Sequence, residues 1–547
     1  MDSMNSVRLL DCTRREAPLD GLMWGELAIR KLIRGLENAN VDMIEVGFLK
    51  DQPYRPGSTS FHTAEDIRPY LSHKKEGVLY TALVDYGRYD LSALSEYDGT
   101  SVDAIRVCFK HHELHAVLDY ARQIRDKGYQ ISIQHVDTMG FTDGEIRRFL
   151  TEVNRLKPLA YSVVDTFGAM YEDDMLRLVH LVEETLDKDI LLGFHGHNNL
   201  MLADANAQRF IREFNGRRDI VVDASLYGCG RSAGNAHTEL LAQYMVRKHG
   251  ARYDIDEILD LIDTVITAAQ EQTTWGYSIP YFISGMHNAH TFNVKQLLKR
   301  HNLRSKDLRG IIDRLDETQK KAYDYALLEK LYVEYFDHPI NDEAVIAELA
   351  EAFRGREILL LAPGRSVRDK RGEIGRFIEE RHPVVIGVNN LIEGYRQDYV
   401  FFSGAVRYND LRYQDLAAAG GPRLIVSSNI PADERRGVLR VNYTSLVKFG
   451  WVNLDSSAIL LLRLLIRCGV RSCYAAGMDG YKQFGEAFYK NELDTGLAEA
   501  DRYEHTRDNI GMMRDIRAET PDFKLRFLTE SIYADIFEGT EKDGEAK

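Results

Sequence analysis

The chain lacks any apolar run long enough to cross a membrane. The longest candidate, SSAILLLRLLIRCGV, is short and is interrupted by Arg463 and Arg467, whereas a membrane-spanning helix needs about 20 apolar residues. The first residues, MDSMNSVRLLDCT, also lack the charged and then apolar pattern of a signal peptide. We therefore expect a cytoplasmic protein with no membrane partner.

Cysteine and positive charge are also scarce. The 547 residues include five cysteines, none of them in a CxxC pair, which is typical of reduced thiols in a cytoplasm. The formal net charge of −14 argues against a nucleic-acid partner, because binding to a phosphate backbone needs a basic face. The net charge does not exclude a small anionic substrate, because a local arginine cluster can bind one.

Eight apolar, strand-like runs recur through the first half of the chain, with helical patterns between most of them. They cover residues 8–13, 43–49, 78–85, 104–109, 130–138, 161–167, 191–197 and 220–228. From the fifth run on, the spacing is roughly 30 residues, which is the length of one βα unit. Eight such units in series predict a (β/α)8 TIM barrel over residues 1–274. An open, doubly wound sheet is the alternative.

The rest of the chain divides into three segments. Residues 275–350 are helical and aromatic in pattern and are expected to form an extension packed on the barrel. Residues 351–537 contain six further strand candidates, at 357–364, 383–390, 399–404, 423–428, 472–480 and 524–531. They predict a Rossmann-like, open parallel α/β domain with helices on both faces. The polar tail 538–547 is expected to be disordered.

Two histidines flank a glycine in the run LLGFHGHNN, at the end of the seventh predicted strand. Residues two apart in a strand point to the same side, so His195 and His197 can both face the carboxyl-terminal mouth, where TIM barrels keep their chemistry. Two imidazoles aimed at one point form a natural chelate for a divalent metal. Two hydrogen-bonded or solvated histidines at a strand end are the alternative.

The first predicted strand ends in LLDCTRREAP, which places Arg15 and Glu16 at the same mouth. Glu16 would complete a set of two histidines and one carboxylate, and Arg15 would neutralise an oxyanion that forms on a substrate. Glu45 lies inside the apolar second strand, where an acid is costly unless it is paired. Arg15 is its expected partner, and a purely structural ion pair is the alternative.

Two further polar residues end predicted strands at this mouth. Asp165 follows the sixth strand and Asn198 follows the seventh. Both are candidates for contact with a substrate. Ordinary capping of the strand ends is the alternative for each of them.

Five motifs, in order, resemble one enzyme family. They are LLDCTRRE, IEVGF, VDTFGAMY, GFHGHNNLMLADANA and VDASLYGCGRSAGNAHTELL, within about the first 285 residues. They resemble the metal-dependent aldolase branch of the barrel superfamily that also holds hydroxymethylglutaryl-CoA lyase, isopropylmalate synthase and 4-hydroxy-2-oxovalerate aldolase. The resemblance implies a catalytic Arg15 held by Glu45. It also implies a manganese, magnesium, zinc or cobalt ion on Glu16, His195 and His197, with Asn235 as a further ligand or as a group that supports the ligands.

The chain departs from the family pattern at two positions. Glu16 stands where the family has aspartate, and Leu19 stands where related aldolases can carry a histidine for proton transfer. The general base is therefore unassigned. Candidates that follow the barrel or its second strand are Tyr277, Tyr281, His287, His290 and His62, and a structural role is the alternative for each.

The resemblance implies an aldol reaction between a 2-oxo acid such as pyruvate and an aldehyde. A Claisen-type condensation with an acyl-CoA, as in isopropylmalate or homocitrate synthase, is one alternative. A barrel that has lost its chemistry and serves as a scaffold for a transferase is another. A homodimer is expected, with the aromatic segment 275–300 as its interface.

In the second predicted domain, LLLAPGRSV places Gly364 and Ser366 between a strand and a helix, where a phosphate can bind. The region resembles the Rossmann-like domains of sialyltransferase-like and methylpterin-pyrophosphokinase-like proteins, which implies a nucleotide or sugar-nucleotide ligand over the strand ends. Asn389, Asn390 and Asp479 are further candidates. A bifunctional enzyme of carbohydrate biosynthesis is the resulting expectation.

Overall fold

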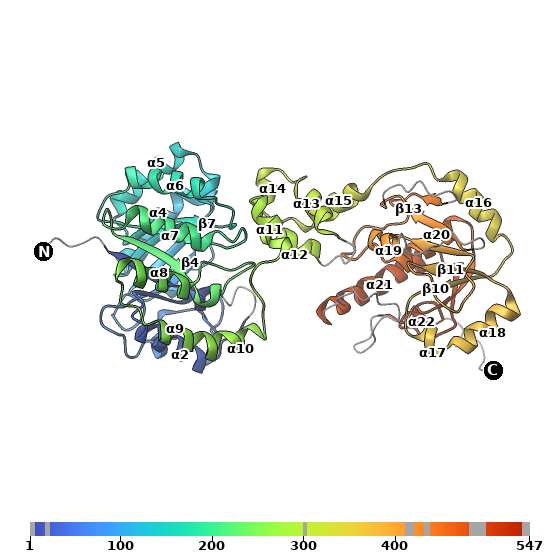
Figure 1. Ribbon diagram of the computed structural model, residues 1–547, viewed down its shortest axis with the longest axis horizontal. Coiled ribbons are helices and arrows are strands. Elements are labelled where there is room, and N and C mark those ends of the chain that lie inside the picture. Colours follow the sequence, from blue (N-terminus) through green and yellow to red (C-terminus); the bar gives the residue numbers. More distant parts are fainter. Residues whose placement is uncertain are drawn as a thin grey trace. The chain divides into compact units, whose positions relative to one another are not determined.

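The computed structural model describes residues 6–16, 22–298, 303–410, 421–430, 438–480 and 499–538 (Figure 1). Leu19, the side chain of Glu16 and residues 539–547 of the expected tail lie outside this description. The chain forms two compact units, residues 1–294 with 317–323 and residues 295–316 with 324–547. The helical segment 275–350 is thus divided between the units. Among the described residues, no helix is long and apolar enough to span a membrane.

The first unit is a closed barrel of eight parallel strands. They are β1 (Val7–Asp11), β2 (Met43–Leu49), β4 (Leu79–Asp85), β5 (Ala104–Phe109), β6 (Gln130–His135), β7 (Ala160–Asp165), β8 (Leu191–Gly196) and β9 (Ile220–Ala224). The barrel closes because β1 pairs with both β9 and β2, and the short β3 (Ser60–Phe61) adds to β2. The predicted TIM barrel is confirmed.

Helices surround the barrel and cover its outer face (Figure 1). They are α2 (Glu26–Asn38), α3 (Ala64–Ile67), α4 (Leu114–Asp126), α5 (Asp143–Leu156), α6 (Glu172–Thr185), α7 (Ala203–Phe214), α8 (Thr238–His249), α9 (Ile255–Leu261) and α10 (Thr267–Gln270), with α1 (Thr13–Glu16) directly after β1. In α5, for example, Ile146, Leu150 and Val153 are buried at helical spacing. A capping box of Thr142 and Glu145 fixes its start.

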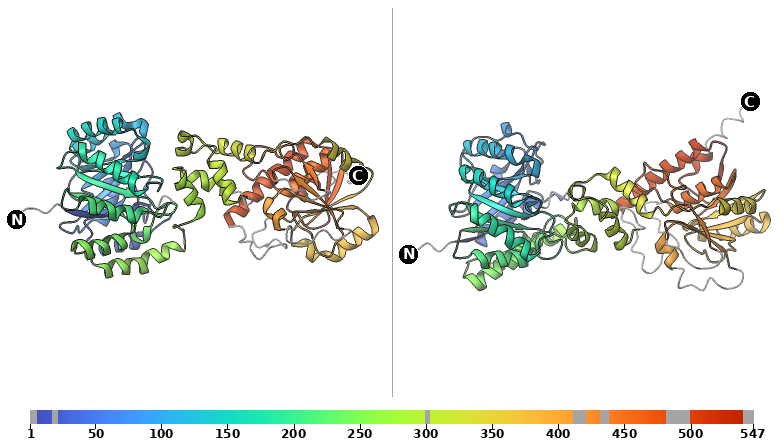
Figure 2. Two further views of the ribbon diagram at one scale, coloured as in Figure 1. Left: turned by 45° about the horizontal axis from the view of Figure 1, so that its top comes forward. Right: turned by 90° about the horizontal axis from the view of Figure 1, so that it is seen from above.

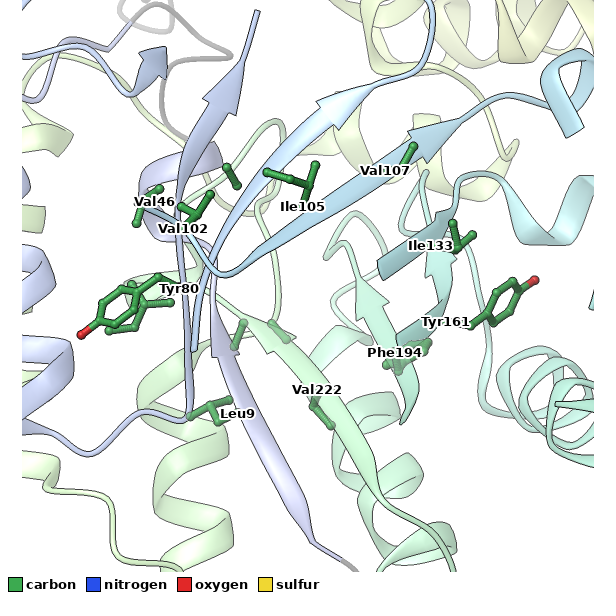
Figure 3. Packing of buried hydrophobic residues seen from close by; sticks show 14 of the residues in the cluster. Leu9, Val46, Tyr80, Val102, Ile105, Val107, Ile133, Tyr161, Phe194 and Val222 are labelled. Carbon is green, nitrogen blue, oxygen red and sulfur yellow. The ribbon is translucent and has the colours of Figure 1, made fainter. Parts of the chain in front are cut away.

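The large apolar core lies between the strands and these helices. Alternate residues of each strand point outward into it, and Figure 3 shows Leu9, Ile105, Ile133 and Val222 doing so from four strands. A separate apolar cluster fills the barrel interior toward the amino ends of the strands. Its members include Leu10, Met43, Ala160, Leu191 and Val221.

The barrel interior becomes polar toward the carboxyl ends of the strands. Two positions beyond the apolar cluster, β2, β7, β8 and β9 carry Glu45, Ser162, Gly193 and Asp223. This layer is tightly packed, since a Cβ added at Gly193 would lie 2.1 Å from the Ser162 Oγ. Apolar side chains thus fill the base of the barrel, and polar side chains face its mouth.

His135 at the end of β6 is a buried core histidine, and its effect on the stability of the barrel can be tested by varying the pH. It is bonded to the Tyr161 hydroxyl and stacks on Phe109, and burial lowers its pKa to about 3. Below about pH 6.5 the unfolded chain therefore binds a proton on His135 that the folded chain does not bind. The unfolding free energy thus decreases as the pH falls. We expect the unfolding free energy of the barrel to drop by about 2 kcal/mol from pH 7 to pH 5 through this group.

The measurement is urea unfolding of the full chain, followed by the fluorescence of Trp24 and Trp275 in a Trp451→Phe background. His135→Asn, which keeps a partner for the tyrosine, should lose that part of the pH dependence. The exposed His112→Asn serves as the matched control. An unchanged slope in His135→Asn would contradict the assignment.

The second unit contains one seven-stranded parallel sheet. Its strands are β10 (Ile358–Leu361), β11 (Val384–Val388), β12 (Tyr399–Phe402), β13 (Arg423–Ser427), β14 (Leu439–Val441), β15 (Ser472–Ala476) and β16 (Lys524–Phe527). Every residue of β10, β11 and β12 is buried, as expected for a parallel sheet covered on both faces (Figure 2). The predicted open parallel α/β domain is confirmed, and β14 is a strand that the sequence analysis did not identify.

The strand order is β14-β13-β12-β11-β10-β15-β16, so successive strands are added on one side of β10 up to β14 and then on its other side. The topological switch point therefore lies between β10 and β15. The surrounding helices are α17 (Ser366–Asp369), α18 (Arg371–Arg381), α19 (Ala405–Asp410), α20 (Ser457–Arg467), α21 (Glu499–Glu519) and α22 (Ala534–Glu538). The segment before the sheet contributes α13 (Ser305–Ile312), α15 (Tyr325–Phe336) and α16 (Glu343–Phe353).

Part of the helical segment packs on loops at the barrel mouth. It comprises α11 (Ile279–Met286), the first residues of α12 (Thr291–Leu298) and α14 (Glu317–Lys321). The Trp275 Nε1 donates to the Tyr227 carbonyl at 2.8 Å, beyond β9. The Lys321 Nζ lies 2.8 Å from the Asp137 carboxylate, beyond β6.

Candidate functional site

A network of buried charges crosses the barrel interior above the apolar cluster. The Arg106 guanidinium on β5 donates to the Glu45 Oε1 at 3.0 Å, to the Gln134 Oε1 at 2.9 Å and to the Asp223 carboxylate. Because β5 neighbours neither β2 nor β9 in the sheet, the contacts with Glu45 and Asp223 span the interior. Arg106 is therefore the residue that joins opposite sides of the barrel.

Arg15 approaches the same network from the end of β1. Its Nε donates to the Glu45 Oε2 at 2.7 Å, and both side chains are buried. Glu45 thus receives one arginine on each carboxylate oxygen. The structure places the expected pair in contact, and Glu45 fixes the orientation of the Arg15 guanidinium.

The network also sets the tautomer of the neutral His195 ring. Burial favours the neutral form of Asp223, but the charge of Arg106 and the bond from His195 outweigh it and lower the Asp223 pKa to about 2. An ionised carboxylate only accepts hydrogen bonds, so the His195 Nδ1 donates to the Asp223 Oδ2 at 2.9 Å. In a neutral ring the lone pair is then on Nε2, which is how metal-binding histidines are commonly oriented.

His197 and Asn235 lie beside His195. The His195 and His197 ring centroids are 4.9 Å apart, and the His197 Nδ1 donates to the Asp165 carbonyl at 2.8 Å. A backbone bridge pairs His197 with Asn235. The Asn235 Nδ2 donates to the Cys229 carbonyl at 3.0 Å, while its buried Oδ1 has no hydrogen-bond partner among the described residues.

Glu16 ends α1, but its side chain lies outside the described part of the structure. Within the described part, no three His, Cys, Asp or Glu side chains converge as a metal-binding group. The two histidines and the asparagine amide are therefore the described portion of the predicted set. Whether Glu16 completes it stays a prediction.

Asp165 and Asn198 hold the loops that follow their strands. The Asp165 carboxylate accepts from the Ala169 and Met170 amides at 2.8 and 3.2 Å, and burial raises its pKa to about 7. The Asn198 Oδ1 accepts from the amide of Ala203, the first residue of α7, at 3.2 Å. Contact with a substrate stays a prediction for both.

The candidates for a general base lie at different places around the mouth. The His62 Nδ1 is 3.1 Å from the Lys50 carbonyl, and the His290 ring is 6.2 Å from that of Phe167, beyond β7. Tyr281 and His287 lie on and just after α11, and Tyr277 is exposed. None of these contacts assigns the base.

The sequence analysis missed Arg106, Gln134 and Asp223. The signal was present, because Arg106 in AIRVCF and Asp223 in IVVDA are charged residues inside apolar strands. The rule that identified Glu45 applies to them equally. Gln134 carries no comparable signal, since an uncharged amide near a strand end is common.

A cavity of about 650 Å³ lies at the opposite end of the barrel. Arg8, Asp42, Met43 and Leu79 line it at the amino ends of β1, β2 and β4. It is separated from the charged network by the apolar cluster, of which Met43 is a member. It is therefore distinct from the site at the mouth.

In the second unit, Gly364, Ser366 and Asp479 meet at the carboxyl ends of β10 and β15. The Gly364 amide donates to the Gly477 carbonyl at 3.0 Å. The Ser366 amide donates to the Asp479 Oδ2 at 2.9 Å, and its hydroxyl donates to the other oxygen. The amide that was expected to hold a phosphate is thus bound by a carboxylate.

Asn389 lies after the neighbouring strand β11 and is followed by Asn390. The Asn389 Nδ2 donates to the Ser457 Oγ at 2.6 Å, and its Oδ1 accepts from the Ser403 amide at 3.3 Å. Asn389 thus ties the ends of β11 and β12 to the start of α20. The five candidates lie at the ends of adjacent strands, and ligand contact stays a prediction for all of them.

A comparison with protein families finds a match within the barrel unit. A family model described as HMGL-like matches residues 27–271. The matched stretch is less than half of the chain. The match includes Glu45, His195, His197 and Asn235, whereas Arg15 and Glu16 precede it. The predicted superfamily is confirmed, and the resemblance of the second unit to Rossmann-like families stays a prediction.

Curated relatives also match part of the chain. An oxaloacetate decarboxylase of Mycobacterium tuberculosis is 28% identical over 278 residues, which are 49% of this chain and 78% of that protein. A 4-hydroxy-2-oxovalerate aldolase of Geobacillus thermodenitrificans is 30% identical over 153 residues, 27% of this chain and 42% of that protein. The chain thus spans less than half the length of that aldolase.

A solved structure aligns with about half of the chain. It is the N-terminal domain of a proposed aldolase from Bacteroides vulgatus, at 22% identity and a TM-score of 0.46. The alignment covers 53% of this chain and 96% of that domain.

Proposed function

We propose that the HMGL-like barrel is a carbon–carbon lyase of the aldolase type that acts on a 2-oxo acid such as pyruvate. The proposal rests on one observation: Arg15 and His195 are both held by the buried network of Glu45, Arg106 and Asp223. The names of the two relatives support it, because both describe reactions of 2-oxo acids. In the synthetic direction the C3 proton leaves, C3 bonds to the aldehyde carbon, and the aldehyde oxygen takes up a proton.

The described residues fit a divalent metal. The Asn235 Oδ1 is buried without a hydrogen-bond partner among them, and the two imidazoles beside it carry their lone pairs on Nε2 when neutral. His195, His197, Asn235 and Glu16 would hold the ion, which would supply Lewis-acid polarisation of the substrate carbonyl. Asp223 strengthens His195 as a ligand through the Nδ1 bond.

Arg15 would act on the substrate itself. Its guanidinium is fixed by Glu45 and would neutralise the negative charge that develops on the ketone oxygen as the C3 proton leaves. A pre-oriented cation requires no reorganisation at that moment, because Arg106 holds the second oxygen of Glu45 and keeps the carboxylate in place. The identity of the base stays open among the candidates named above.

The test is proton exchange at C3 of pyruvate, followed by NMR in deuterated water. We expect the full chain to catalyse the exchange with added manganese or magnesium and to lose it with a chelator. His197→Asn should lose both the exchange and the bound metal, whereas His62→Asn should keep the metal. Absence of exchange with every metal and 2-oxo acid tested would contradict the proposal and favour the acyl-CoA condensation or the scaffold.

We extend the proposal to the second unit, with a nucleotide or sugar nucleotide as its ligand. Support comes from the strand order, because ligands of open parallel sheets bind at the carboxyl ends of the strands beside the switch point, here β10 and β15. Because the Asp479 carboxylate would repel a phosphate, we place a sugar or base beside it. A homodimer and a bifunctional role in carbohydrate biosynthesis also stay predictions.

A further inference from the structure

Two cationic side chains at the barrel mouth play no part in the charged network. Lys50 directly follows β2, and Arg231 lies in the loop that follows β9. In the closed barrel β2 and β9 are separated only by β1, the strand that leads to Arg15. Both residues therefore lie on the side of the mouth from which Arg15 enters the site.

Lys50 forms no ion pair with any described acid. Its Nζ lies 4.6 Å from the centre of the Phe48 ring, and neither an ion pair nor a hydrogen bond of the ammonium is present among the described residues. Burial lowers the pKa of Lys50. The charge of Asp85 raises this pKa, and the charges of Arg231 and Arg88 lower it. The Lys50 residue itself is half-buried.

Asp85, whose negative charge acts on Lys50, also pairs with Arg88. Asp85 ends β4 and lies 3.6 Å from the Arg88 guanidinium, which reaches back from the following loop. Arg231 has no ion pair within the described part of the chain. Among the described residues, Arg88 therefore forms an ion pair, whereas Lys50 and Arg231 form none.

The described acids of the charged network do not balance these charges. The two arginines of the network, Arg15 and Arg106, are matched by Glu45 and Asp223. Two partly buried cations without acceptors are costly unless a ligand supplies negative charge. The arrangement thus favours an anion bound beside the place where the 2-oxo acid meets Arg15.

We propose that Lys50 and Arg231 bind an anionic group at the far end of the second substrate, so that the aldehyde taken by this barrel carries a carboxylate or a phosphate. The inference rests on the proposed aldolase function, because it assigns the partner of the 2-oxo acid. Lys50 and Arg231 are specificity residues in this scheme, and removal of the C3 proton from the 2-oxo acid does not require them.

The test compares aldehydes that differ only in the anionic group. Butanal is matched with 4-oxobutanoate for the carboxylate, and glyceraldehyde is matched with glyceraldehyde 3-phosphate for the phosphate. Binding to the full chain with saturating pyruvate is measured by calorimetry, and kcat/KM for addition is measured alongside. We expect one anionic aldehyde to be preferred by about 10- to 100-fold, the range of a charge-assisted contact.

Lys50→Met and Arg231→Met should each reduce that preference at least tenfold and leave the exchange of pyruvate C3 protons within about threefold of wild type. Lys50→Arg should retain the preference, and the distant, exposed Arg147→Met is the matched control. Exchange without any preference for an anionic aldehyde overturns this inference and leaves the aldolase proposal intact. Preferential anion binding that depends on Lys50, in a chain that shows no exchange, supports the site and contradicts the aldolase proposal.

Discussion

Replacement of Arg15 by methionine is expected to slow the C3 exchange of pyruvate by about 10² to 10³-fold, the usual effect of removing one pre-oriented donor from a developing oxyanion. Arg15→Lys should recover only part of the rate, because an ammonium lacks the planar fork that Glu45 orients. The measurement is the NMR exchange rate in deuterated water at saturating metal.

The structure separates this effect from unfolding. In Arg15→Met, the Glu45 carboxylate is still bound by Arg106 at 3.0 Å, so Glu45 keeps a cationic partner. The variant should therefore fold and bind metal as the wild type does. Arg147→Met, which removes an exposed pair with Glu184, is the control. Exchange within threefold of wild type in Arg15→Met would exclude Arg15 from the reaction.

Replacement of Arg106 by methionine is expected to destabilise the barrel by about 3–5 kcal/mol, because it leaves Glu45 and Asp223 in a closed interior with too little positive charge. Arg106 is 2% exposed, so water cannot compensate for the loss. The unfolding free energy of the full chain in urea, reported by Trp24 and Trp275 in the Trp451→Phe background, measures the effect.

Two further variants make this prediction specific. Arg106→Met combined with Asp223→Asn should recover part of the lost stability, since one unbalanced charge is removed with the other. Arg147→Met should cost no more than about 1 kcal/mol, because exposed ion pairs contribute little. A loss below about 1 kcal/mol in Arg106→Met would show that the network is not a principal source of stability.

Much of the barrel could be predicted from the sequence. Eight apolar runs at βα spacing correspond to the eight strands of the closed sheet, and the HxH pair and Glu45 both lie where strand alternation places them. The short β14 escaped prediction because three residues, one of them arginine, carry no clear period. The division of residues 275–350 escaped it because helical pattern does not reveal which body a helix packs against.

Pairing within the site was harder to predict. Arg106 and Asp223 are 117 positions apart, and each was visible as a charged residue in an apolar strand. Nothing local shows that one guanidinium serves Glu45, Gln134 and Asp223 together. The structure also shows Asp479 on the Ser366 amide, which a reading of LLLAPGRSV as an open phosphate site did not anticipate.

The sequence by itself determined the strands, the side of each strand that faces inward, and the histidine pair, because these follow from the period of the backbone over a few residues. Only the tertiary structure decided which charges meet. Closure of the sheet brings β2, β5 and β9 across one narrow interior, and in that space each buried charge requires a partner whose distance along the chain is immaterial.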